Sequence, residues 1–168
     1  LFKLTRCLDK AGVYLRFKKE NMDFKLRKAT IADASNIFEL VYELAVYENE
    51  PESMITQIAD FEIALTSGQI EAFVVEKDGI TAGMCLYFDY FSTWKGRTLY
   101  LEDFIVRPQF RRLGIGKLLF ESLLDEARNR KCKLVKWQVL DWNELAKSFY
   151  LKYRCQISSE WENCIMEL

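Results

Sequence analysis

Histidine is absent from this sequence of 168 residues. Because histidine is the commonest general base and a frequent zinc ligand, a Ser-His-Asp triad is excluded and no metal site is expected. The five cysteines are odd in number and no two have C-x-x-C spacing, so we expect free thiols in a reducing compartment, the cytoplasm. Any catalysis must rely on carboxylate, tyrosine, lysine, thiol or backbone groups.

Long apolar runs and excess charge are also lacking. No stretch approaches the roughly 20 apolar residues that span a bilayer, so no membrane association is predicted. The net charge of −1 gives no reason to expect nucleic acid as a partner. Half of the residues are apolar and 29% are charged, which is the balance of a globular domain with a sizeable core.

The first residues differ from the rest of the chain. Residues 1–21 contain six basic and two acidic side chains with little periodicity, and the sequence does not begin with methionine. We therefore expect an N-terminal extension over 1–21, outside the fold, and a single domain over 22–168.

From Met22 onward the pattern is that of an α/β fold. Asp78-Gly79 predicts a hairpin turn, and Thr30 with Asp33 predicts a capping box at the start of a helix that runs to Tyr47. These elements predict a mixed, mostly antiparallel central sheet with helices on both faces. Strands are predicted at 23–28, 70–77, 80–88, 98–106, 133–140 and 163–168, and further helices at 56–67, 114–130 and 143–153.

A glycine-containing loop at 111–117 passes from a predicted strand into a helix. Helix N-termini leave about four N–H groups unpaired, which attract phosphate oxygens, and glycines let a phosphate approach the backbone. A Walker A loop would need glycine in place of Arg111, and a dinucleotide fingerprint would need glycine or alanine in place of Leu119. The pattern is instead R-x-x-G-x-G; the alternative is a tight turn that binds no ligand.

Two adjacent carboxylates, Glu102 and Asp103, fall inside the predicted strand 98–106. An alkylamine with a pKa near 10.4 is protonated at pH 7, so a carboxylate could attract it and accept its proton. Strict alternation along a strand would place the two side chains on opposite faces. The alternative is that the strand begins later and both carboxylates are solvated.

The predicted helix 143–153 offers a second set of candidates. Asn143 is a natural N-cap, and Tyr150 lies two turns further along the same helix. A phenol with a pKa near 10 could protonate a departing thiolate. The alternatives are a purely structural cap and a packed aromatic ring.

Together these segments resemble the Gcn5-related N-acetyltransferase superfamily. Within it they resemble the spermidine/spermine N1-acetyltransferase group, closest to the thialysine Nε-acetyltransferase branch, which Ser92 favours because polyamine-acetylating members tend to have an acidic residue there. The segments that carry the resemblance are 43–48, 92–98, 100–103, 111–116, 140–143 and Phe149-Tyr150.

The resemblance implies direct transfer of an acetyl group from acetyl-CoA to a primary amine, by a homodimer with the family's acyltransferase fold. Tyr150 would be the general acid and Glu102 the base. The cofactor would be held by Phe104, Ile105, Val106, Arg111, Arg112, Leu113, Gly114, Ile115, Gly116, Lys117, Asn143, Glu144, Leu145, Ala146 and Tyr150. The amine would be bound by Tyr47, Glu48, Trp94, Glu102, Asp103, Lys136, Trp137, Gln138 and Glu160.

One departure and several alternatives remain. Arg154-Cys155 stands where the family usually has a glycine-containing turn, which leaves the packing of the final segment open. The amine could instead be a polyamine or belong to a protein. A non-catalytic acyl-CoA-binding module would need neither Glu102 nor Tyr150, and their presence speaks against that alternative.

Overall fold

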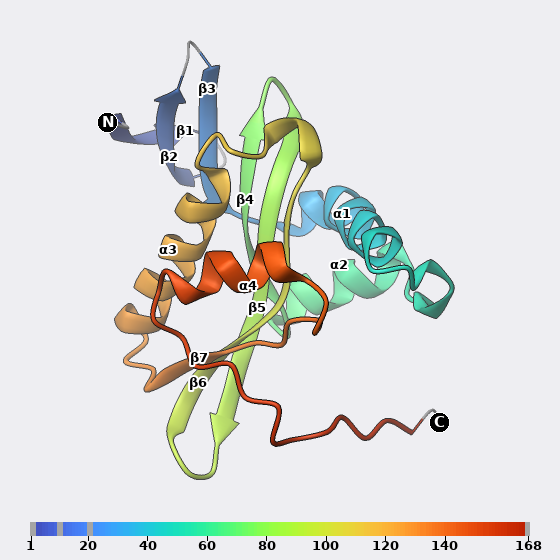
Figure 1. Cartoon of the computed structure of the whole chain (residues 1–168). Helices are drawn as coiled ribbons and strands as arrows, with labels where there is room; N and C mark the ends of the chain where they lie inside the picture. The colour runs from blue at the N-terminus through green and yellow to red at the C-terminus, as the bar shows by residue number, and fades with distance from the viewer. Residues whose placement is uncertain (1–2, 10–11, 20–21, 167–168) are drawn as a thin grey trace. The chain divides into compact units, whose positions relative to one another are not determined.

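A computed structural model of the chain describes residues 3–9, 12–19 and 22–166. Two compact units make up the chain, residues 1–137 and residues 138–168. The first unit is built on a seven-stranded sheet whose strands follow chain order (Figure 1). The strands are β1 (Lys3–Asp9), β2 (Gly12–Lys19), β3 (Met22–Lys28), β4 (Glu71–Lys77), β5 (Ile80–Ser92), β6 (Gly96–Val106) and β7 (Leu134–Lys136).

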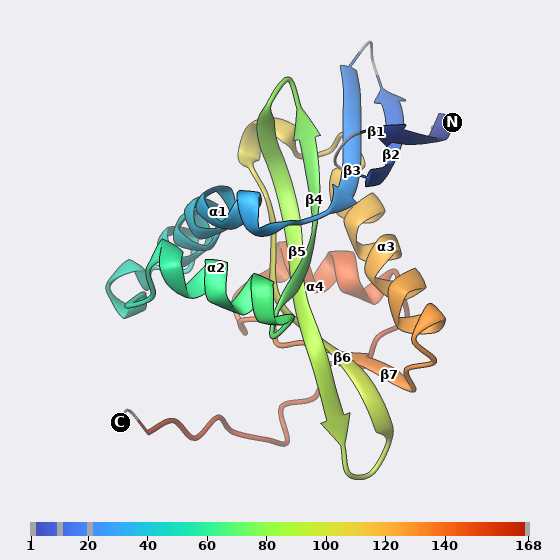
Figure 2. The same ribbon diagram turned by 180° about the vertical axis from the view of Figure 1, so that it is seen from behind.

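Helices cover both faces of this sheet. As Figures 1 and 2 show, α1 (Ala34–Tyr47) and α2 (Ile58–Ser67) lie on one face and α3 (Ile115–Asn129) lies on the other. Adjacent strands are antiparallel except for β6 and β7, which are parallel. The predicted mixed, mostly antiparallel sheet between helices is confirmed. Three short 3-10 turns complete the unit: η1 (Ile31–Asp33), η2 (Pro51–Ser53) and η3 (Pro108–Phe110).

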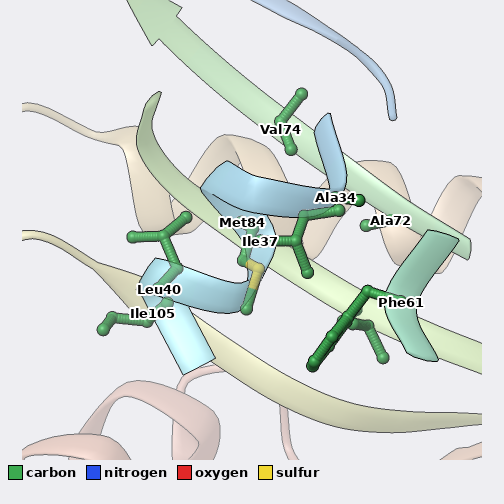
Figure 3. Packing of buried hydrophobic residues seen from close by; sticks show 9 residues of the cluster. Ala34, Ile37, Leu40, Phe61, Ala72, Val74, Met84 and Ile105 are labelled. Atoms are coloured by element: carbon green, nitrogen blue, oxygen red, sulfur yellow. The ribbon is translucent and has the colours of Figure 1, made fainter. Parts of the chain in front are cut away.

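The core beneath α1 and α2 follows from the two side-chain periods. Every second residue of a strand points to this face, and every third or fourth residue of a helix points back at it. Fully burying an aliphatic or aromatic side chain contributes about 1.5–3 kcal/mol, so this cluster fixes α1 on the sheet. Its buried members are Ala34, Ile37, Leu40, Phe61, Ala72, Val74, Met84, Leu86 and Ile105 (Figure 3).

The opposite face carries α3. Leu119, Phe120 and Leu123 are fully buried. Cys85 of β5 donates its thiol hydrogen to the Leu119 carbonyl across 3.7 Å, and burial raises the pKa of this thiol to about 12. Cys85 is therefore a core residue and not a reactive thiolate.

Two strands precede Met22. Residues 3–9 and 12–19, within the predicted extension over 1–21, form β1 and β2 and continue the sheet beyond β3. Leu15 and Phe17 stand opposite Leu26 and Phe24, so a period-two apolar pattern is present among the basic residues. The division of the chain into an extension and a domain over 22–168 stays a prediction.

Other elements also depart from the pattern. β7 ends at Lys136, although the predicted strand continues to residue 140. The ring of the next residue, Trp137, packs edge-on against Phe120 of α3, with ring centroids 5.5 Å apart. In the second unit α4 (Glu144–Leu151) is present, but residues 163–166 form no strand, and residues 167 and 168 lie outside the described residues. Trp161 is 80% exposed, and a strand there would need a partner edge for its backbone groups.

Within the described part of the chain, no helix is both long and apolar enough to cross a membrane.

Candidate active site

A register shift in β6 places the two predicted carboxylates. Leu86 of β5 is paired with Asp103 and the next residue, Tyr87, is paired with Leu101, so Glu102 is an extra residue on β6. A bulge of this kind interrupts the alternation of side chains and increases the local twist. Asp103 consequently shares the sheet face of Leu86, beneath α1. The expectation that Glu102 and Asp103 simply alternate between faces does not allow for this bulge.

The electrostatics show that three carboxylates gather here. Burial raises the pKa of Asp103 to about 7, and the charges of Glu102 and Glu48 add to the shift. Burial also raises the pKa of Glu102 and of Glu48. Glu48 caps the C-terminal end of α1, so the packing of that helix brings it to Asp103. A cationic group entering this cluster would relieve the repulsion between the carboxylates.

The pairing of β6 with β7 ends just before the carboxylates. β6 and β7 pair only along residues 98–100 and 134–136, so the pairing stops before the carboxylates. An extended chain carrying amide groups can add to a strand edge of this kind. Phe104, Ile105 and Val106 lie along this stretch, where the sequence predicts main-chain contacts with the pantetheine arm. The centroid of the Phe104 ring lies 6.0 Å from that of Phe120 on α3, so the Phe104 side chain also has a structural role.

The predicted anion-binding loop follows β6 and opens α3. Gly114 is the N-cap, with φ of 88°, a left-handed conformation that glycine adopts without steric cost. No side chain caps the start of this helix, and the first intrahelical bond runs from the Leu118 N–H to the Gly114 carbonyl at 3.0 Å. The N–H groups of Ile115, Gly116 and Lys117 therefore precede the ladder and are donors for an anion.

Gly116 has no packing reason to be glycine. A Cβ added there would meet the Phe104 ring at 3.7 Å and a Val106 methyl group at 3.8 Å, both of which are ordinary contacts. Alanine would stabilise a helix at such a position, since glycine is about 1 kcal/mol less favourable. Since packing does not require glycine at this position, the physical reason that fits is the close approach of a ligand to the backbone.

Arg107 and Arg111 link this turn to α1. Arg107 pairs with Glu43 at 2.8 Å and donates to the Thr81 carbonyl at 3.0 Å. Arg111 donates from Nε to the Val106 carbonyl at 2.9 Å, and its guanidinium carbon lies 5.6 Å from the centre of the Tyr47 ring. Sequence reasoning missed Arg107; its only signal was a basic residue after a strand and acidic residues one helical turn apart on α1.

In the second unit, the predicted N-cap is confirmed. The Asn143 side-chain oxygen accepts a hydrogen bond from the Ala146 N–H at 3.1 Å and so starts α4. Tyr150 is 5% exposed, and its ring contacts Phe149 at 5.4 Å. Glu144 pairs with Lys147 on the first turn of α4 at 2.9 Å, whereas Leu145 is exposed.

The other residues predicted to contact the amine lie on several different elements. Trp94 is 82% exposed at the tip of the β5–β6 hairpin. The Lys136 ammonium lies 6.0 Å from the centre of the Tyr90 ring, and Trp137 packs on α3. Gln138 and Glu160 belong to the second unit, where Gln138 donates to the Asn163 side chain at 2.5 Å and Glu160 is exposed.

Comparison with known proteins identifies the fold and the chemistry. A family model described as "Acetyltransferase (GNAT) family" matches residues 34–154. The chain belongs to this family. It is therefore an acetyl-CoA-dependent N-acetyltransferase, which transfers an acetyl group to an amine.

Curated relatives agree with the GNAT assignment. A thialysine N-epsilon-acetyltransferase of Bos taurus is 33% identical over 151 residues, which cover 82% of this chain and 86% of that protein. A protein of the same name from Caenorhabditis elegans is 30% identical over 128 residues, covering 76% of this chain and 80% of that one. These acetyltransferases and the family match disfavour a nucleotide-binding protein and a non-catalytic module.

A solved structure extends the agreement to the fold. An aminoglycoside acetyltransferase from an uncultured soil metagenomic sample, in complex with trehalose, superposes with a TM-score of 0.75 at 16% identity. The match covers 90% of this chain and 99% of that one. At this identity the likeness concerns the GNAT fold alone.

Proposed function

We propose that this GNAT enzyme acetylates a terminal primary amine of a small cationic molecule, most closely thialysine. The observation that carries the proposal is the cluster of Glu48, Glu102 and Asp103, which the bulge of β6 and the end of α1 bring together. Such a cluster attracts an alkylammonium group and repels an anionic acceptor. The names of the bovine and nematode relatives support thialysine as the amine.

Acetyl transfer requires the amine in its neutral form. Glu102 would take one proton from the bound ammonium, directly or through a water molecule, while Asp103 and Glu48 hold the substrate. The amine nitrogen would then attack the thioester carbonyl, forming the C–N bond as the C–S bond breaks. Tyr150 would donate its phenolic proton to the departing thiolate and would regain a proton from the nitrogen, which loses its second proton as the amide forms. Glu102 would release the first proton to solvent, and no acetyl-enzyme would form.

The cosubstrate would lie along β6 and the start of α3. The edge of β6 beyond residue 100 would pair with the amides of the pantetheine arm, and the open N–H groups of residues 115–117 would face the pyrophosphate. Arg112 and Lys117 are exposed beside these groups and supply positive charge. By the family resemblance, residues 143–146 at the capped start of α4 would also bind the cosubstrate.

The assembly and the compartment are also proposals. The family resemblance supports a homodimer. The cysteines are free thiols, of which Cys85 is fully buried, and this supports a reducing compartment such as the cytoplasm.

The proposal is tested by measuring thiol release from acetyl-CoA with thialysine, lysine, spermidine, spermine, putrescine and a lysine-containing peptide. Preferential turnover of thialysine is the expected result. Preference for spermidine or spermine would keep the chemistry and move the enzyme to the polyamine branch. Asp103→Asn is the matched variant: it should raise KM for cationic amines while leaving KM for acetyl-CoA near that of the wild type.

A further inference from the structure

The side chain of Arg111 contacts the end of β6 and the end of α1. The backbone of Arg111 is extended, with φ of −68° and ψ of 159°, whereas the next residue, Arg112, has φ of 62°. The backbone therefore changes from an extended to a left-handed conformation between the two arginines. Arg111 is held by the carbonyl of Val106 and lies over the ring of Tyr47, at the distances given above.

Tyr47 stands where α1 has the least support from burial. It is the last residue of the helix and is 38% exposed, and its neighbour Val46 is 49% exposed. Leu40, two turns earlier, is completely buried, so the core fixes the middle of the helix more firmly than its end. Glu48, a member of the carboxylate cluster, follows Tyr47 directly.

We propose that Arg111 is a positioning residue for the amine site, acting through Tyr47, and that its guanidinium is not a ligand of the cosubstrate pyrophosphate. A guanidinium over a tyrosine ring is attracted by the ring electrons and stacks on its face. Together with the bond to Val106, this contact ties the last turn of α1 to the end of β6. The inference rests on the proposed function, because it takes the carboxylates beside Tyr47 as the amine site.

A link between the two substrate sites follows from this geometry. The loop that begins at Arg111 continues into the N-terminus of α3, where the pyrophosphate would bind. Ordering this loop would also order Tyr47, so each substrate should strengthen the binding of the other by the same factor. Removing the Arg111 guanidinium from the Tyr47 ring should weaken this coupling between the binding of the two substrates.

The test compares two adjacent arginines. Arg111→Gln keeps a hydrogen-bond donor but removes the cation, and we expect KM for the amine to rise about two- to fivefold, as for loss of one exposed cation–π contact. KM for acetyl-CoA should change by less than about twofold, within the limits of that same contact energy. Arg112→Gln is the matched control and should raise KM for acetyl-CoA instead. Arg111→Lys should restore most of the amine affinity, because it returns a cation to the ring.

A second readout does not depend on turnover. Amide hydrogen exchange at residues 48–50, whose N–H groups close the end of α1, should be faster in Arg111→Gln than in the wild type. Tyr47→Leu should reproduce the effect on amine KM, and the double variant should show no further loss.

Two results would overturn the inference: unchanged exchange at residues 48–50, or an Arg111→Gln variant whose acetyl-CoA KM rises while its amine KM does not. If the wild type acetylated no amine of the panel, the proposed function would fail, whereas the exchange measurement would still decide whether Arg111 holds Tyr47.

Discussion

Asp103 of β6 stands opposite Leu86 of β5, so an ionisable carboxyl group lies at the edge of the core beneath α1. Only a bulge makes this pairing possible. In a regular ladder Glu102 would pair with Leu86, and Asp103 would share a sheet face with Leu101, which is paired with Tyr87 on the side of α3. The placement of this one carboxyl accounts for its raised pKa, and it is the basis of our proposal that the site attracts a cationic substrate.

The first prediction concerns stability and pH. The pKa of Asp103 is about 7 in the folded protein against an ordinary value of 3.8. Below about pH 4 the Asp103 carboxyl is mostly protonated in both the folded and the unfolded protein, so it costs little stability. As pH rises toward 7 the unfolded chain loses its proton first, so stability falls, and above 7 the whole cost is present. Asp103→Asn should therefore raise the free energy of unfolding by roughly 2–4 kcal/mol at pH 8 and by little at pH 3.5.

Denaturant unfolding at the two pH values measures this difference. Glu102→Gln serves as the control, since the Glu102 side chain is more exposed and should give a smaller effect. An equal gain for Asp103→Asn at both pH values would show that repulsion and burial of the charge are not its cause.

The second prediction separates stability from cosubstrate binding at Gly116. Gly116→Ala should raise the free energy of unfolding of the ligand-free enzyme by about 0.5–1 kcal/mol, because a Cβ fits there and alanine favours the helix. The same methyl group should weaken acetyl-CoA binding by blocking the approach of an anion to the backbone. Thermal unfolding with and without coenzyme A measures both effects. A variant that is stabilised and binds as tightly as the wild type would remove the loop from the cofactor site.

The third prediction concerns the departure from the family pattern after α4. Arg154 has φ of 57°, the left-handed region in which a side chain costs about 1–2 kcal/mol. The conformation that the family's glycine would favour is thus present, but an arginine occupies it. Arg154→Gly should stabilise the protein by about 0.5–1 kcal/mol after the loss of backbone entropy is included.

Lys152→Gly is the matched control for Arg154→Gly, because Lys152 has right-handed helical angles at the end of α4. It should destabilise the protein by about 0.5–1 kcal/mol in the same unfolding experiment. If both glycines destabilised equally, backbone strain at Arg154 would be excluded as the explanation.

The fourth prediction tests the general acid. Tyr150→Phe keeps the buried ring and removes only the hydroxyl group. Turnover should fall by about 100-fold or more, as for loss of a general acid, with acetyl-CoA affinity nearly intact. Steady-state kinetics combined with calorimetric binding of coenzyme A make the distinction. Normal turnover would take the acid role away from Tyr150.

Local signals in the sequence predicted most of the fold. Asp78-Gly79 does turn a hairpin between β4 and β5, and Asn143 does cap α4. The helix predicted to run to Tyr47 is present and buries Ile37 and Leu40 against the sheet, and the glycine loop opens α3. These features depend on backbone angles, caps and side-chain periods within a few residues, which a sequence contains directly.

Contacts between distant residues decided the rest. The bulge at Glu102 depends on the register between β5 and β6, and the contact between Trp137 and Phe120 depends on how α3 packs on the sheet. The contact between Arg111 and Tyr47 joins residues 64 positions apart in the numbering. No local pattern specifies such pairs, because their free energy comes from burial, charge and ring contacts that exist only once the sheet has brought both partners together. The sequence by itself determined most of the helices and strands between Met22 and Leu151 and the residue types that the chemistry needs. The tertiary structure decided which carboxylates come together and which arginine contacts Tyr47.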